Sequence, residues 1–279
     1  MASPAGTVLG TRRDVTSQLV LSTLVFVMIP LAFLMLMELV KSLGRVPDYK
    51  LPHVWDIASY LTKPNYEGEP AGLYLLDGMR TTAVEALIGL GFAVVAGVVL
   101  GTLVVYLPRV GRGVLPLIVG VQNLPIIALA PPLLVWIGTD WKSKSIIAAY
   151  VAFFPMVVFT VRGLSSARPQ LLALMRSYAA GPWQTFHTVR FPVAVPYLFS
   201  GLRAAAALSV VGAIVAELPV GSNTGIGQII YNAAAFYNFD PAALWASTVA
   251  AFGLGAGFFL AVVLLEWLVS LAVGNRAQT

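Results

Sequence analysis

Long stretches without charged side chains constrain this chain more than any other feature of its sequence. At a rise of about 1.5 Å per residue, roughly 20 apolar residues in a helix cross the hydrocarbon core of a bilayer. Only 10% of the residues are charged, whereas a water-soluble domain carries about 25%. We therefore predict an all-α membrane protein with six transmembrane helices, which cover 15–37, 86–108, 113–139, 145–161, a stretch after Arg203 that contains Glu217, and 241–265.

The distribution of arginine predicts how these helices are oriented. Ten of the twelve arginines fall in alternate segments, whereas all five lysines and most of the acids fall in the segments between them. Cytoplasmic segments of membrane proteins are enriched in Lys and Arg. The arginine-rich segments are therefore predicted to be cytoplasmic, and an even number of spans places both termini there.

Residues 17–40 are predicted to form the first transmembrane helix. We interpret this stretch as an uncleaved span, because its apolar run is too long for a signal peptide. A proline-rich outer, periplasmic loop follows and contains a short amphipathic piece from His53 to Leu61. The complete expected order is a cytoplasmic tail over 1–16, the first helix over 17–40, the outer loop over 41–77, a five-helix core over 78–271 that includes a cytoplasmic loop over 162–203, and a cytoplasmic tail over 272–279.

The composition leaves few residues for enzymatic chemistry. The chain has no cysteine and two histidines, so we predict no disulfide, no metal site and no catalytic residue. We interpret His187 as a surface contact residue. No Gly-x-x-x-x-Gly-Lys-Ser/Thr phosphate loop occurs, so any nucleotide-driven activity needs a partner protein. A net charge of +5 in so apolar a chain is typical of a membrane protein and predicts no nucleic-acid partner.

Small residues recur every four positions in three of the predicted helices. This spacing places them on one helix face, where a second backbone can approach closely. We expect each stripe to pack inside the bundle. The stripes are Gly89, Ala93, Gly97 and Gly101; Gly201, Ala205, Ser209 and Ala213; and Gly253, Gly257 and Ala261.

The third predicted span is a candidate for the lining of a pathway. Pro125, Pro131 and Pro132 remove backbone donors and kink or unwind a helix. In hydrocarbon the freed carbonyls must be satisfied by protein or by a water-filled cavity. The amides of Gln122 and Asn123 stand just before the break, where they can line a pathway or form hydrogen bonds between helices.

Polar residues near the predicted outer ends of the fifth and sixth spans are further pathway candidates. Glu217 is expected close to the outer interface, either as a gate or loop anchor, or as an interfacial acid bonded to the loop that starts at Pro219. The loop over 221–240 is rich in Gly, Asn and aromatic residues, including Asn223 and Tyr231. It can turn back into an outer vestibule, or it can form an ordinary interfacial cap.

The loop over 162–203 contains two helix-compatible stretches, around 168–180 and 183–190, separated by the turn signal Gly181-Pro182. The motifs of the loop are Arg176-Ser177-Tyr178-Ala179-Ala180, Trp183-Gln184, Phe186, Phe191-Pro192, Pro196 and Gly201-Leu202-Arg203. The motifs that flank it are Val215-Ala216-Glu217 and Gly225-Ile226-Gly227 downstream, and Pro125, Pro131, Trp136 and Gly138 upstream. The loop resembles the EAA loop of permease subunits of binding-protein-dependent ABC importers. The flanking motifs are similar to the nitrate, sulfonate and taurine branch, and the likeness extends from about Asp77 to Leu268.

Two positions of the loop depart from the family pattern. In the register of Trp183 and Gln184, the family's glutamate falls on Ala173 and its usual glycine falls on Ala179. A salt bridge from the missing acid to a partner is therefore not available. The helix-turn-helix pattern and Arg176 remain.

The resemblance implies a type I ABC importer permease fold in a bacterial plasma (inner) membrane, surrounded by lipids. It implies two ABC ATPase subunits, which bind the ATP and Mg that this chain does not bind, and a periplasmic or lipid-anchored solute-binding protein. It also implies a homodimer or a pair with a sister permease. ATP-driven closure of the ATPases would switch the pathway between inward-facing and outward-facing states through a coupling loop that comprises Arg168, Arg176, Ser177, Tyr178, Ala179, Ala180, Gly181, Pro182, Trp183 and Phe186.

The solute is predicted only by class. Stretches over 153–158, 196–201 and 208–213 look most like branch members that handle pyrimidines, thiamine-precursor pyrimidines or riboflavin. The expected solute is therefore a pyrimidine-like or vitamin-precursor N-heterocycle, or else a sulfonate, taurine or nitrate-type anion.

Two other functions remain as alternatives. An ion-coupled secondary transporter needs acids or cations near the middle of the membrane and is often built from repeated halves. The sequence has no internal repeat that we recognise, and Glu217 is expected away from the midplane. An intramembrane enzyme needs a nucleophile and a base on facing helices, but no histidine lies in a predicted span.

Overall fold

The computed structural model describes residues 28, 32, 34–44, 46–64, 68–218 and 225–276, and this part of the chain is helical apart from loops and one isolated bridge between Pro64 and Pro70. A helical segment over 34–44 comes first. The later elements are α2 (Val54–Tyr60), α3 (Ala71–Tyr106), α4 (Pro108–Gln122), α5 (Ile126–Ile137), α6 (Trp141–Ser165), α7 (Pro169–Ser177), α8 (Pro182–Thr185), the π-helical turn η1 (Phe186–Arg190), α9 (Phe191–Glu217), α10 (Ile226–Ala235) and α11 (Pro241–Arg276).

Four helical stretches of the described chain are long and apolar enough to cross a membrane. They are 71–106, 141–165, 182–217 and 241–271. The third stretch consists of α8, η1 and then α9. A fifth span is possible only if α4 and α5, which meet at an angle of 95°, form one broken span. Most of the first predicted span, 15–37, lies outside the described residues. The all-α prediction is confirmed, and four to five of the six expected spans fall in the described part.

Helices α3 and α6 extend past charged residues that we expected to bound them. Glu85 lies inside α3, and Lys144 lies in the first turn of α6. Both side chains are buried. The expected boundaries were wrong because these two charges pair with each other in the interior instead of facing water.

The centre of the bundle is formed by α3, α6 and α9. A Cβ atom added to Gly89 would lie 2.6 Å from the Cβ of Ala148, and one added to Gly97 would lie 2.5 Å from the Cβ of Met156. The stripe of small residues on α3 therefore lets the α6 backbone approach closely, as predicted. The stripe on α9 is buried in the same core. Such close van der Waals contact drives helix association in lipid, where burial of apolar surface gains little.

The third predicted stripe does not pack inside the bundle. A Cβ atom added to Gly253 or Gly257 would have no heavy atom from another described part of the chain within 4 Å, and Ala261 is exposed. Helix α11 instead packs through Leu254, Val262 and neighbouring apolar residues on a different face. The prediction of internal packing for Gly253, Gly257 and Ala261 was therefore wrong for a single chain.

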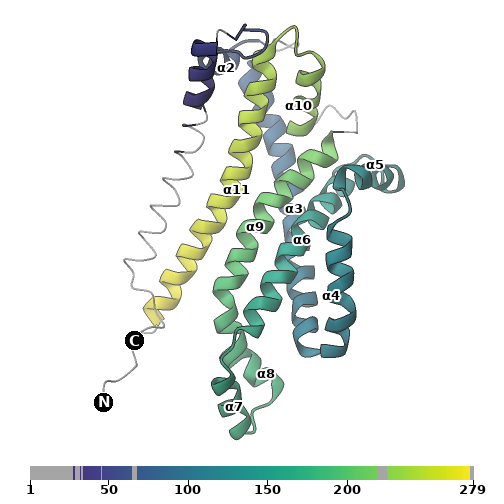
Figure 1. Ribbon diagram of the computed structural model, residues 1–279, viewed down its shortest axis with the longest axis vertical. Coiled ribbons are helices and arrows are strands. Elements are labelled where there is room, and N and C mark those ends of the chain that lie inside the picture. The colour runs from purple at the N-terminus through teal and green to yellow at the C-terminus, as the bar shows by residue number, and fades with distance from the viewer. Residues whose placement is uncertain are drawn as a thin grey trace.

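The two ends of the bundle differ in charge. Figure 1 shows α7 and α8 projecting at one end, called here the α7 end, and α2 and α10 gathered at the opposite end, called the α10 end. Arginines mark the α7 end: Arg109 and Arg112 at the start of α4, Arg162 in the last turn of α6, and Arg168, Arg176 and Arg190 around α7 and η1. The structure thus gathers the arginine-rich segments on one side.

At the α10 end, polar contacts join the helical segment over 34–44 to the residues that follow it. The Lys41 Nζ lies 2.7 Å from the Asp48 carboxylate, and His53 lies 2.7 Å from Glu38. The hydrogen bond and charge of Lys41 lower the pKa of Asp48. Tyr237 donates a hydrogen bond to the Lys50 carbonyl. The short amphipathic piece noted from His53 to Leu61 forms the helix α2.

Candidate functional site

The expected helix-turn-helix at the α7 end is present. Helix α7 begins with Pro169, whose missing N–H costs nothing at a first helical position. None of its residues is buried. Leu174 in this helix and Tyr178, which caps it, are large side chains that are 50% and 75% exposed. Gly181-Pro182 then starts α8. The structure therefore presents a short helix with apolar side chains that nothing in the described part of the chain covers.

Helix α7 ends in a Schellman motif, and this motif explains why the family pattern has a glycine at the position of Ala179. Ala180 N–H donates to the Met175 carbonyl and Ala179 N–H donates to the Arg176 carbonyl, which is the bonding pattern of that motif. Ala179 has a φ of 51°, in the left-handed region that glycine adopts without strain. This residue stands where the family's glycine was placed by register. The backbone geometry of the loop is thus retained at a cost of about 1 kcal/mol for the Cβ.

Aromatic side chains connect α8 to the end of α3. Trp183 is 73% exposed and stacks on Phe186 with ring centroids 5.8 Å apart. Phe186 is half-buried and in turn packs edge-on against Tyr106, the last residue of α3. His187 is exposed and touches Trp183 at 4.2 Å between centroids. The Trp183 ring is therefore exposed, and its position is fixed through Phe186, which packs against α3.

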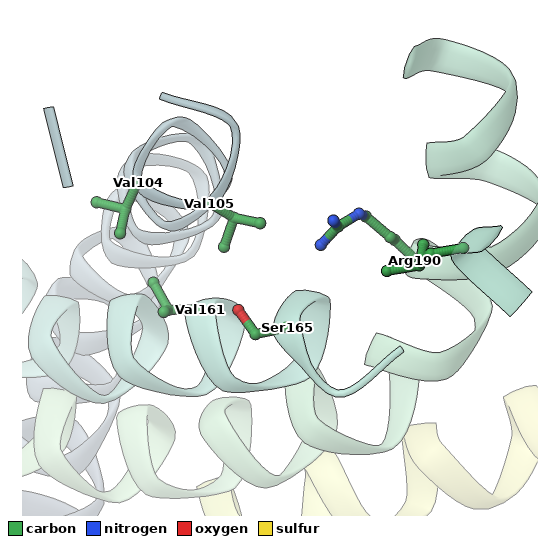
Figure 2. Close-up of a pocket in the computed structure, with 6 residues that line it drawn as sticks. Val104, Val105, Val161, Ser165 and Arg190 are labelled. Atoms are coloured by element: carbon green, nitrogen blue, oxygen red, sulfur yellow. The ribbon is translucent and has the colours of Figure 1, made fainter. Parts of the chain in front are cut away.

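Arg190 joins η1 to α6 and α3. Its Nη1 donates a 2.8 Å hydrogen bond to the Leu164 carbonyl, and its guanidinium lies 5.4 Å from the centre of the Tyr106 ring. Figure 2 shows this side chain reaching toward α3 across an open cleft of about 360 Å³. Sequence reasoning assigned no role to Tyr106 or Arg190, because their partners come from helices far apart in the chain. The cleft is lined by Val104, Val105, Val161, Ser165, Leu172 and Arg190.

Each predicted coupling residue lies at the α7 end. Arg168 precedes α7, Arg176 and Ser177 form its last turn, and Pro182, Trp183 and Phe186 begin the helix that continues into α9. All ten are exposed except Ala180 and Phe186, which are half-buried. The ten residues are Arg168, Arg176, Ser177, Tyr178, Ala179, Ala180, Gly181, Pro182, Trp183 and Phe186.

The predicted break in the third span lies at Asn123 to Pro125, between α4 and α5. Gln122 ends α4 and Asn123 caps it, and both are exposed. Pro131 and Pro132, in contrast, lie within the continuous helix α5 and are exposed. The chain therefore bends at Pro125 and not at Pro131-Pro132. Helix α5 packs through Ala130 and Leu134 against Ile147 and Ala216, which brings it beside the end of α9.

Glu217 lies at the end of α9 and is fully buried. Its Oε1 accepts a 2.6 Å hydrogen bond from Thr82 of α3, and its Oε2 accepts a 2.6 Å hydrogen bond from the Gly227 N–H of α10. Gly227 belongs to the segment that starts at Pro219, so Glu217 is bonded to that segment, as both interpretations expected, and its side chain is buried. Of the other candidates in this region, Tyr231 is exposed on α10, whereas Asn223 lies outside the described residues.

Three buried polar residues of the cluster that contains Glu217 were not predicted from the sequence. Thr82, Glu85 and Lys144 are buried next to it or next to each other. Glu85 and Lys144 were assigned to span ends because they are charged. A signal was present, since the residues before Glu85, from Leu73 to Met79, are mostly apolar and compatible with a helix that continues upstream.

A second ion pair lies on the other half of α9. Arg203 Nη1 lies 2.8 Å from Glu266 Oε2 of α11, and both side chains are about one-third exposed. The pair joins α9 to α11.

Comparisons with known proteins agree with this geometry. The chain is 39% identical over 140 residues to the formylaminopyrimidine transport permease protein ThiX of Halalkalibacterium halodurans, a match that covers 50% of this chain and 56% of that protein. It is 34% identical over 115 residues to the riboflavin transport system permease protein RibX of Chloroflexus aurantiacus, covering 41% of this chain and 42% of that protein. The matches thus span about half the length of these relatives.

The fold also has a solved counterpart. A chain from inward-facing structures of the MetNI methionine ABC transporter matches with a TM-score of 0.57 and 20% identity, covering 76% of this chain and 99% of that chain. In sequence, residues 93–273 match the family of binding-protein-dependent transport system inner membrane components. This range includes α5, the helix-turn-helix of α7 and α8, Glu217 and α10. The chain is a member of that family of inner-membrane, multi-pass permeases.

Proposed function

We propose that this chain is the transmembrane subunit of an ATP-driven importer and that α7 and α8 couple it to separate ATPase subunits. The observation that supports this most strongly is the exposed, apolar α7–α8 surface at the end of a bundle. In a soluble loop, uncovered residues such as Leu174, Tyr178 and Trp183 mark a protein contact. The groove of an ATPase subunit is the partner that the family membership suggests.

The helical stretch that carries Trp183 connects the ATPase contact to the transmembrane bundle, so a movement of the ATPase is transmitted to the pathway. Residues 182–217 form one helical stretch from α8 through η1 to the end of α9. The π turn at Phe186–Arg190 is a local irregularity of the kind often found at functional sites. A shift of Trp183 on the ATPase would therefore move α9, because both belong to this one helical stretch. The contacts of Phe186 with α3 and of Arg190 with α6 would transmit the movement to those two helices.

The complete assembly in this proposal has two permease chains, two ATPases and a solute-binding protein. Two copies of this chain, or this chain and a sister permease, form the pathway between them. Each chain has six spans with both termini in the cytoplasm, which places the arginine-rich α7 end inside. ATP and Mg bind to the ATPases, and the binding protein delivers solute at the α10 end. Gln122, Asn123, Pro125, Pro131, Pro132, Glu217, Asn223 and Tyr231 remain our candidates for the pathway or its gate.

For the solute we propose a small N-heterocycle related to pyrimidines or vitamin precursors. The names of the relatives ThiX and RibX support this class. Sulfonate, taurine and nitrate-type anions form the second class to be tested.

One observation favours a second candidate function. Buried acids and a buried lysine inside membrane helices, here Glu85, Glu217 and Lys144, occur in transporters driven by proton gradients. Their hydrogen bonds and ion pair join them to each other and to backbone, which is the arrangement of a structural cluster. A test of the main proposal must nevertheless separate ATP from a proton gradient as the energy source.

The experiment uses the chain in proteoliposomes with its candidate ATPase and binding protein. Uptake of a radiolabelled formylaminopyrimidine, riboflavin and taurine is followed with ATP on the ATPase side. We expect uptake that needs all three proteins and ATP, and that persists when a protonophore collapses the proton gradient. Uptake by the chain alone, driven by an imposed gradient, would overturn the proposal in favour of the secondary transporter.

A further inference from the structure

Four buried polar side chains meet between α3, α6 and α9. Thr82 and Glu85 come from α3, Lys144 from α6 and Glu217 from α9. Each residue is at most 2% exposed. Lys144 Nζ lies 3.2 Å from Glu85 Oε1. Thr82, three residues before Glu85 on α3, donates a 2.6 Å hydrogen bond to Glu217 Oε1, which places the two carboxyl groups next to each other. Groups of this kind are costly to bury, so their charges and hydrogen bonds must be balanced within the cluster.

The cluster contains two carboxyl groups and one ammonium group. If both carboxyls were ionised, two negative charges would face each other in the interior with one positive charge to balance them. One proton between the two carboxyls makes the cluster neutral. The same proton accounts for Glu85 Oε2, which is buried and accepts no hydrogen bond from any N–H or O–H donor in the described part of the chain. A carboxyl–carboxylate hydrogen bond gives this oxygen a partner.

The cluster also holds the start of α10. The Gly227 N–H donates to Glu217 Oε2, and the Ile226 N–H donates to Thr82 Oγ1 at 2.9 Å. These are first-turn amides, which have no partner inside their own helix. Gly225 has a φ of 101°, and a Cβ at this position would overlap the Glu217 carboxyl group. The glycine thus allows the carboxyl group to lie directly against the backbone at the start of α10.

We propose that Glu85 and Glu217 share a single proton and, with Lys144 and Thr82, form a neutral cluster that fixes the start of α10 against α3 and α9. We call these four residues the α10 lock. Glu217 is the positioning residue that binds α10, and Glu85 and Lys144 set its charge. Glu217, the member of the α10 lock on α9, ends the helical stretch that begins at Pro182 and contains Trp183. A displacement of α9 therefore acts directly on α10. This inference goes beyond the proposed transport function and stands without it.

The shared proton makes a specific prediction for infrared spectroscopy of the full chain in lipid nanodiscs. At neutral pH, the wild-type chain should show the carbonyl-stretching band of one buried, protonated carboxylic acid. Both Glu85→Gln and Glu217→Gln should remove the band, because one ionised acid then balances the charge of Lys144 within the cluster and no proton is needed. Lys144→Met should increase it, because both acids then take a proton. A band that survives either glutamine variant would overturn the shared proton.

Charge balance also predicts a non-additive pattern in stability. Each single glutamine variant keeps one anion for Lys144 and should shift the melting temperature by less than about 4 °C. The double variant Glu85→Gln/Glu217→Gln leaves Lys144 unpaired, so its loss should exceed the sum of the two single losses. Adding Lys144→Met to the double variant should restore most of the loss. Additive effects, or no rescue by Lys144→Met, would contradict a neutral cluster.

The position of α10 can be measured independently of stability and transport. The chain has no cysteine, so spin labels can be attached at Leu76→Cys on α3 and Tyr231→Cys on α10, which are both exposed. We expect a narrow distance distribution in the wild-type background and in Glu217→Gln, which can still accept from Gly227. Glu217→Leu and Thr82→Val should broaden it. A control pair at Leu87 and Ile146, also exposed, should stay narrow in every variant.

Two results would overturn the positioning role. The first is a Leu76–Tyr231 distribution in Glu217→Leu that equals the wild-type one. The second is equal broadening of the control pair, which would indicate general loosening of the bundle. Because none of these measurements needs an ATPase or a solute, their outcome is separate from that of the uptake experiment.

Discussion

Glu217 accepts a 2.6 Å hydrogen bond from the backbone N–H of Gly227, and this bond joins the end of α9 to the start of α10. The two residues are ten positions apart in the chain. A carboxyl group at the positive end of a helix is favourable, and here the glycine removes the Cβ that would keep it away. The Gly225-Ile226-Gly227 motif therefore has a physical reason, which is close approach of the Glu217 carboxyl group to the backbone.

Gly225→Ala is expected to be more destabilising than Gly138→Ala. Both glycines have nearly the same positive φ, 101° and 102°, so both variants carry backbone strain of about 1–3 kcal/mol. Only at Gly225 would the new Cβ also overlap the Glu217 carboxyl group, since Gly138 has no described neighbour within 4 Å. Denaturant titration of the purified chain in detergent measures the difference. Equal losses would show that the carboxyl contact does not matter.

Gly97→Ala should lower the free energy of unfolding by about 1–3 kcal/mol. The added methyl group would lie 2.5 Å from the Met156 Cβ and 3.2 Å from the Val157 nitrogen, so α3 and α6 would have to separate. Gly91→Ala on the same helix is the matched control. It meets nothing within 4 Å in the described part of the chain and should be neutral or stabilising by up to about 1 kcal/mol, because alanine is the better helix former. The reverse order of the two variants would contradict the packing.

Ala179→Gly should stabilise the end of α7 by about 1 kcal/mol, because it removes the Cβ from a left-handed residue. Ala180→Gly has no such gain, since the φ of Ala180 is not positive. Hydrogen exchange of the amides of Ala179 and Ala180, which close the Schellman motif, reports the local stability. Faster exchange in Ala179→Gly than in the wild-type chain would be evidence against the left-handed geometry.

Arg190→Gln is expected to loosen the joint between η1 and α6 without exposing the core. The variant loses the charged hydrogen bond to the Leu164 carbonyl and the contact with the Tyr106 ring, which together contribute about 2–3 kcal/mol. We expect a lower ATP-driven uptake per ATP hydrolysed. Arg112→Gln, near the start of α4 at the same end of the bundle, where the side chain is exposed, is a control for loss of charge alone. Unchanged coupling in Arg190→Gln would remove this residue from the coupling path.

The sequence was sufficient for features that depend on local chemistry. Apolar runs predicted most spans, Gly181-Pro182 predicted the break between α7 and α8, and the spacing of Gly89 and Gly97 predicted the α3 face that packs on α6. These features follow from helix period, turn residues and side-chain volume, which can be read from one sequence. The register that assigned a glycine position to Ala179 also agrees with its left-handed backbone.

The sequence was insufficient where distant residues compensate each other. A charge normally ends a span, but Glu85 and Lys144 can lie inside the bundle because each neutralises the other. The same holds for Arg203 and Glu266. The sequence also does not specify whether a stripe of small residues faces another helix of the same chain, so Gly253 and Gly257 were wrongly assigned to the packed face of α11. Pairings between helices are set by the fold as a whole.

The central claim is that ATP-driven transport passes through the α7–α8 surface, and uptake by a Trp183→Ala variant tests it most directly. Trp183 is exposed at the α7 end, so its removal should leave folding intact. Trp55→Ala, on the equally exposed α2 at the other end, is the matched control. The account predicts that Trp183→Ala inserts normally but loses ATP-driven uptake in proteoliposomes, while Trp55→Ala retains coupling to the ATPase. Wild-type uptake by Trp183→Ala, with all partners present, would contradict the account.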